Sequence, residues 1–114
     1  MPYLLVQTSV RVEAEARERL LAAASVRVSE LLGKAERYVM VALRDGVPMR
    51  FAGNDEPCAY LELKSIGLQE SQTPALSAGL CALVREHLGV PPERTYIEFA
   101  AAPRALWGWN GGTF

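Results

Sequence analysis

Apolar residues recur with two periods along the chain, and these periods predict strands at both ends of each half and a helix between them. The first strand is predicted over residues 2–8. Its apolar side chains fall on both faces, with Tyr3 and Leu5 on one and Leu4 and Val6 on the other. A strand that is apolar on both faces is typical of the middle of a sheet.

Two helices are predicted where apolar residues return every three or four positions. The first runs over residues 12–32 and ends at Gly33, a residue suited to a helix C-cap. The second runs over residues 74–88 and ends at Gly89. Thr73 is predicted to cap its start, and Pro74 suits the first turn.

Three further strands are predicted over residues 38–43, 58–65 and 95–99. The third strand of the chain alternates cleanly, so one of its faces belongs to the core and the other does not. Its core face carries Ala59, Leu61 and Leu63, and its other face carries Tyr60, Glu62 and Lys64. Asp45-Gly46 marks a turn before a long loop.

The two halves repeat the order strand, helix, strand, which predicts an α+β fold with a single domain over residues 1–114. Each crossover is long enough for parallel pairing, giving one four-stranded mixed sheet with two helices on one face. The uncovered face would carry polar and aromatic residues: Tyr60, Glu62, Lys64, Tyr96 and Glu98. A closed homo-oligomer is expected to cover it.

Composition and charge reduce the number of partner classes and cellular locations that the protein could have. The formal net charge of −1 gives no electrostatic reason to expect nucleic acid or an anionic membrane. No apolar run approaches the ~20 residues of a membrane span, and the short apolar start lacks the features of a signal peptide. We expect a cytoplasmic protein, with non-classical release left open.

Cys58 and Cys81 are expected to be buried free thiols, and the single histidine, His87, makes a metal site improbable.

The candidate chemistry begins at Pro2. Removal of Met1 would leave Pro2 with a free secondary amine, whereas an internal proline has only an amide nitrogen without N–H. The α-amino group is one of the few protein groups that titrate near neutral pH without a large shift. A terminal amine anchored by a strand could therefore act as a positioned general base.

A set of short motifs spread over the whole chain carries a resemblance to a known family. The motifs are Pro2, Gly33-Lys34, Met49 and Phe51, Glu56-Pro57-Cys58-Ala59, Ser65-Ile66-Gly67, Leu80-Cys81, Arg94 with Tyr96-Ile97, and Gly108-Trp109-Asn110 with Thr113-Phe114. In this order and spacing the chain resembles the tautomerase superfamily, specifically the family of macrophage migration inhibitory factor and D-dopachrome tautomerase.

The resemblance implies a homotrimer of βαββαβ subunits with pockets between subunits. Pro2 would be the base that moves a proton next to a carbonyl, and Lys34 the cation for the substrate carboxylate or enolate oxygen. The backbone amide of Ile66 would bind substrate, and a neighbouring subunit would contribute Tyr96 and Glu98. The wall or rim positions would be Tyr3, Tyr38, Trp109 and Phe114. The implied activity is a keto–enol tautomerase of the phenylpyruvate type on small aryl α-keto acids, without metal or organic cofactor.

Departures from the family pattern keep alternatives open. Glu98 replaces an asparagine and could act near Pro2, or pair with Lys64 or an arginine across the sheet face. Trp107 replaces a small residue and would reshape the pocket mouth, and the lone Cys58 does not support dithiol chemistry. The alternatives are a cytokine-like signalling protein with a vestigial pocket, whose receptor the sequence does not indicate, or a hydratase, dehalogenase or decarboxylase using Glu98, with Arg104 as a loose candidate.

Overall fold

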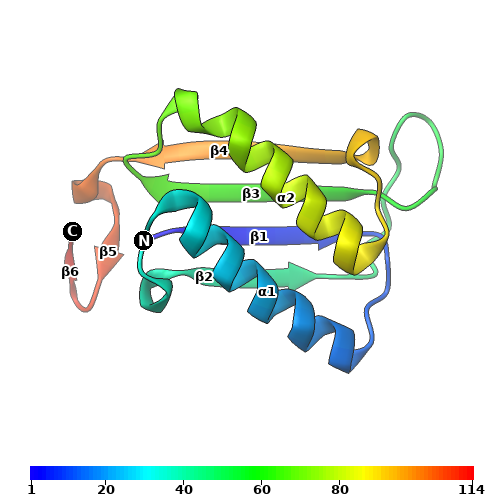
Figure 1. Cartoon of the computed structure of the whole chain (residues 1–114), viewed down its shortest axis with the longest axis horizontal. Helices are drawn as coiled ribbons and strands as arrows, with labels where there is room; N and C mark the ends of the chain where they lie inside the picture. The colour runs from blue at the N-terminus through cyan, green and yellow to red at the C-terminus, as the bar shows by residue number, and fades with distance from the viewer.

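One four-stranded mixed sheet, covered on one face by two helices, forms the body of the protein (Figure 1). The computed structural model describes all 114 residues. The main elements are β1 (Tyr3–Thr8), α1 (Ala14–Leu32), β2 (Met40–Arg44), β3 (Ala59–Ile66), α2 (Thr73–Leu88) and β4 (Thr95–Ala102), followed by a small hairpin of β5 (Gly108–Trp109) and β6 (Gly112–Thr113). The predicted fold class is confirmed.

The strand order is β2-β1-β3-β4, so β1 lies inside the sheet as predicted. β1 pairs with β2 in parallel and with β3 in antiparallel, and β3 pairs with β4 in parallel. The mixed pattern arises because each half makes its own parallel pair through a helical crossover, and the two halves then join through β1 and β3.

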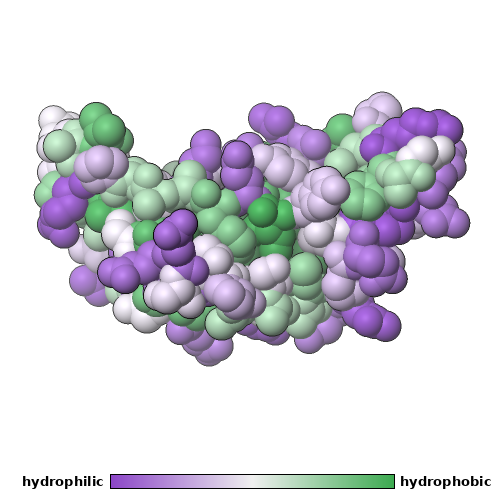
Figure 2. Space-filling view, turned by 90° about the horizontal axis from the view of Figure 1, so that it is seen from above, coloured by the Kyte–Doolittle hydropathy of each residue, from purple (hydrophilic) through white to green (hydrophobic).

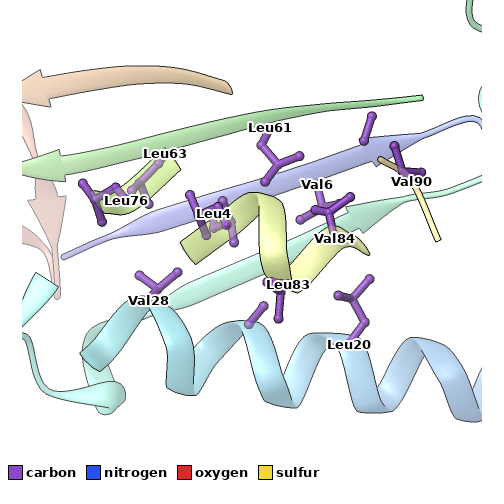
Figure 3. Close-up of a cluster of buried hydrophobic side chains, with 13 residues drawn as sticks. Leu4, Val6, Leu20, Val28, Leu61, Leu63, Leu76, Leu83, Val84 and Val90 are labelled. Carbon is purple, nitrogen blue, oxygen red and sulfur yellow. The ribbon is translucent and has the colours of Figure 1, made fainter. Parts of the chain in front are cut away.

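The core lies between the sheet and the helices (Figure 3). Leu4 and Val6 of β1 and Leu61 and Leu63 of β3 point into it and are at most 1% exposed. The helices meet them with one buried stripe each: Leu20, Ala24 and Val28 on α1, and Leu76, Leu80, Leu83 and Val84 on α2. The predicted alternation of β3 is therefore confirmed, and its other face is left uncovered by helices.

Four local predictions need correction. The second strand begins at Met40, since Glu36–Tyr38 forms a 3-10 turn, and β4 continues to Ala102 through its pairing with β3. Thr73 is not a cap, because its hydroxyl donates to the Glu70 carbonyl at 2.8 Å and closes the turn that precedes α2. Cys58 is buried, but Cys81 is only half-buried, and both are free thiols.

Arg94 fastens the long loop after β2 to the sheet. It is 9% exposed and donates to the backbone carbonyls of Pro57 and Glu56 at 2.9 Å and of Phe51 at 3.3 Å. Its guanidinium also lies 5.1 Å from the centroid of the Phe51 ring. A buried guanidinium needs several acceptors, and here carbonyl groups supply them in place of a carboxylate.

The helices are too short or too polar to cross a lipid bilayer.

Candidate active site

The two ends of the chain meet at one end of the sheet (Figure 1). Together they line a cavity of about 250 Å³. It lies where the start of β1, the turn before β2 and the β5–β6 tail come together. Six of the predicted site residues line it: Pro2, Tyr3, Tyr38, Trp107, Trp109 and Phe114. The sheet therefore joins residues more than 100 positions apart into one apolar site.

The wall of the cavity is a group of three packed aromatic rings. The Trp109 and Phe114 rings stack with centroids 5.2 Å apart, and Tyr38 meets them edge-on at 5.9 and 6.2 Å. Such arrangements add to the stability gained from burial alone. The 3-10 turn that removes Tyr38 from β2 is what brings its ring to this wall.

Two hydrogen bonds fasten the tail that carries this wall. The Phe114 amide donates to the Trp107 carbonyl at 3.1 Å, and Arg104 Nε donates to the Phe114 carbonyl at 3.1 Å. Arg104 is not among the residues that line the cavity. The structure thus gives Arg104 a role in holding the tail, and it does not place this arginine at the pocket.

Pro2 is buried at the cavity and fixed by its backbone. Its carbonyl accepts a hydrogen bond of 3.0 Å from the Met40 amide, which ties the start of β1 to β2. Met1 is attached in this structure, so the Pro2 nitrogen is a tertiary amide. Burial, and secondarily the positive charge of Lys34, lower the pKa of the Met1 amino group below its usual value.

Lys34 and Ile66 lie together in an adjacent hollow. Lys34 Nζ donates to the Ile66 carbonyl at 2.8 Å, and both residues line this second hollow and not the Pro2 cavity. The lysine follows Gly33, whose left-handed conformation ends α1 with a φ of 63°, and the Lys34 amide bonds back to the Ser29 carbonyl at 3.1 Å. The helix end therefore aims this cation toward the end of β3.

Tyr96 and Glu98 are not brought to Pro2 of the same chain. Both lie on β4, where Tyr96 packs against the Phe51 ring with centroids 4.8 Å apart. Glu98 accepts a hydrogen bond of 3.1 Å from the Tyr60 hydroxyl. The expectation that a neighbouring subunit delivers these residues to the site stays a prediction.

The alternative in which Glu98 pairs with Lys64 or with an arginine is not found within the chain, because Glu98 takes part in none of its ion pairs. Lys64 Nζ lies 3.6 Å from Glu62, which also accepts from the Tyr60 hydroxyl at 3.2 Å. Glu62 and Glu98 are register partners on neighbouring strands, so Tyr60 stands between two carboxylates. Its partial burial and these hydrogen bonds and charges raise the pKa of Tyr60 to about 12.

Three residues that line the cavity, Arg37, Val39 and Met40, were missed by sequence reasoning, and Arg37 is the only charged one of them. Arg37 lines the cavity and its guanidinium lies over the Tyr38 ring, with Cζ 4.8 Å from the ring centroid. The sequence signal for Arg37 is its place between Lys34 and Tyr38, which are both predicted site residues. Elsewhere, no three side chains of the His, Cys, Asp and Glu types are grouped as they would be around a metal ion.

Comparison with known proteins gives the family. The sequence model described as "Macrophage migration inhibitory factor (MIF)" matches residues 1–114. The mouse macrophage migration inhibitory factor is 34% identical over 115 residues, covering 100% of this chain and 99% of that protein. The solved homologue from Prochlorococcus marinus is 48% identical with a TM-score of 0.92, over 98% of each chain. The solved Trichinella spiralis factor is 31% identical with a TM-score of 0.90, over 98% of this chain and 99% of its own. The chain therefore belongs to the macrophage migration inhibitory factor family.

Proposed function

We propose that the protein is a keto–enol tautomerase that uses Pro2 as its general base on small aryl α-keto acids, once Met1 has been removed. The observation that carries this proposal is the burial of Pro2 at a cavity walled by Tyr38, Trp109 and Phe114. The cavity suits one aromatic ring, and membership in the tautomerase superfamily supports an isomerase activity in general.

The surroundings of the terminus favour a neutral amine. Burial and the Lys34 charge already lower the pKa of the Met1 amine, and the same two influences would act on an amine at buried Pro2. A lower pKa leaves more of the amine unprotonated near neutral pH, which is the form that accepts a proton. Removing an α-proton places negative charge on the carbonyl oxygen, and the Lys34 ammonium would stabilise that charge or the substrate carboxylate.

A complete site on this proposal needs more than one chain. Tyr96 and Glu98 lie on the sheet, away from the Pro2 cavity of their own subunit, and Tyr96 is 66% exposed. We propose a homotrimer in which each subunit brings these residues to the cavity of its neighbour. The fold shared with the solved relatives supports such self-association, and the proposed reaction needs a small keto acid but no cofactor.

The test compares phenylpyruvate enolisation by the wild type and Pro2→Gly, after intact-mass measurement has established that Met1 is absent from both. Loss of the base should lower kcat/KM by at least about 100-fold. Pro48→Gly is the matched control, because Pro48 lies in the loop after β2 and does not line the cavity. It should keep the wild-type rate. Equal rates for the wild type and Pro2→Gly would remove Pro2 from the mechanism.

A further inference from the structure

We propose that Arg37 determines substrate specificity by binding a second carboxylate, so that the cavity prefers aryl keto acids with a carboxylate on the ring. This inference rests on the proposed tautomerase function, which Pro2 and Lys34 would carry out. Arg37 would add recognition of the part of the substrate that does not react.

The first observation is where Arg37 lies. It belongs to the 3-10 turn Glu36–Tyr38 and lines the same cavity as Pro2. Its guanidinium lies over the Tyr38 ring, with Cζ 4.8 Å from the centroid. A cation over an aromatic face is attracted by the ring quadrupole, which holds the long side chain near the aromatic wall.

The second observation is that this cation has no carboxylate partner. The ion pairs of the structure join Arg17 to Asp45, Arg27 to Glu86 and Lys64 to Glu62. Arg37 takes part in none of them, although Glu36 is its neighbour in sequence. No aspartate or glutamate lines the cavity, and Arg37 is its only charged side chain. Within its own subunit, an anionic group that entered the cavity would meet this guanidinium without competition from an acidic residue.

The third observation is that Arg37 and Lys34 line different cavities. Lys34 Nζ is held 2.8 Å from the Ile66 carbonyl in the neighbouring hollow, whereas Arg37 is at the aromatic wall. Two separated cations fit two separate anionic groups better than one. Lys34 would take the keto-acid carboxylate or the enolate oxygen, and Arg37 would take the carboxylate on the ring.

The chemistry of arginine explains why the group that it binds should be a carboxylate. A guanidinium stacked on a ring still presents its N–H groups at its edge, and their fork matches the two oxygens of a carboxylate. A lysine offers only a compact charge and lacks that match. We therefore expect Arg37→Lys to keep part of the preference and Arg37→Gln to lose it.

The kinetic test measures kcat/KM for phenylpyruvate and for para-carboxyphenylpyruvate with methionine-free protein. Arg37→Gln should lower the ratio of the second value to the first by about fivefold, the upper range for a solvent-exposed ion pair. The effect should shrink at high salt. Arg19→Gln removes an equal charge from the exposed face of α1, and it should leave the ratio unchanged. An equal loss on both substrates, or no loss, would overturn the proposal.

A binding test separates this proposal from the catalytic one, because it needs no turnover. Both tryptophans of the chain line the cavity, so intrinsic fluorescence reports its occupancy. Titration with benzoate and terephthalate should show tighter binding of terephthalate to the wild type, and this preference should fall in Arg37→Gln but not in Arg19→Gln. The same preference in Arg37→Gln would contradict the role of Arg37, whereas failure of the Pro2→Gly comparison alone would contradict only the proposed base.

Discussion

At the scale of single residues, the Tyr60 hydroxyl is held between two carboxylates. It lies 3.2 Å from Glu62 and 3.1 Å from Glu98, which are paired across β3 and β4. A hydroxyl has one proton, so it can donate to only one of these carboxylates at a time. An ionised Tyr60 would put a third negative charge beside them, and the protonated form is therefore favoured.

The pH dependence follows from the raised pKa of Tyr60, about 12 in the folded protein against about 10 in an unfolded chain. Between these values the folded state holds a proton that the unfolded state has released. The stabilising contribution is therefore present below pH ~10 and is lost as the pH rises toward ~12. Urea unfolding at pH 9, 10 and 11 should show a steeper loss of stability in the wild type than in Tyr60→Phe.

The same pair of proteins gives a direct titration. The phenolate absorbance of the wild type minus that of Tyr60→Phe should have its midpoint near 12 while both remain folded. A midpoint near the ordinary tyrosine value of about 10 would show that Glu62 and Glu98 do not favour the protonated form.

The sequence alone predicts part of this cluster around Tyr60. Strand alternation alone assigned Tyr60, Glu62 and Lys64 to one face. It did not determine that Glu98 lies opposite Glu62 and not opposite Lys64, since that depends on the pairing register of β3 with β4. Arg37 was missed for a related reason: a turn residue has no periodicity that predicts where its side chain points.

At the scale of elements, the end of α1 controls the position of Lys34. Gly33 has a φ of 63°, a conformation that costs other residues more than glycine. A Cβ at this position would meet no atom within 4 Å, so a substitution tests backbone conformation with little added crowding.

Gly33→Ala should lower the free energy of unfolding by about 1 kcal/mol, because alanine is strained in the left-handed region. Gly33→Asn should cost less, since asparagine visits that region more readily. Urea denaturation of the three proteins provides the measurement and its matched control. Equal stability of Gly33→Ala and the wild type would mean that α1 ends in another way in solution.

The sequence predicts which helices and strands exist, but it predicts their first and last residues less accurately. Long apolar stripes identified both helices, and the glycines that follow them identified where they end. The alternation of side chains that predicts β4 ends at Phe99, because three alanines follow it. Pairing with β3 nevertheless continues to Ala102. The sequence pattern predicts Tyr38 in a strand, whereas the 3-10 turn at Glu36–Tyr38 places it at the cavity.

At the scale of the whole molecule, the sheet has one face without helices. Figure 2 shows a hollow between two projecting ends, one of which is the β5–β6 tail. Tyr96 is 66% exposed and Met40 65% exposed on the outer strands of the sheet. Their register partners, Tyr3 and Tyr60, lie on the same face, and an uncovered sheet face with several such side chains is a candidate contact surface.

The proposed trimer predicts a mass in sedimentation equilibrium of about three times the 12.5 kDa of one chain. Tyr96→Glu should shift this mass toward the monomer, because a charge would have to be buried at the contact. Val26→Glu is the control, since Val26 is 44% exposed on α1. A fully active wild-type monomer would exclude the need for a neighbouring subunit.

The fold was predictable at this scale because repeated strand, helix and strand patterns leave few topologies. The cavity was not, since its wall comes from residues at opposite ends of the sequence with no shared pattern. The resemblance to the family predicts ten site residues, and the structure brings six of them together at this cavity.

The meeting of the two termini has a practical consequence for handling the protein. Met1 and Phe114 both line the cavity, so an affinity tag fused to either end would begin inside or against it. A tag before Pro2 would also leave its nitrogen as an amide. Labels are better placed on the exposed face of α1, for example at Arg19, which does not line the cavity and does not lie on the sheet.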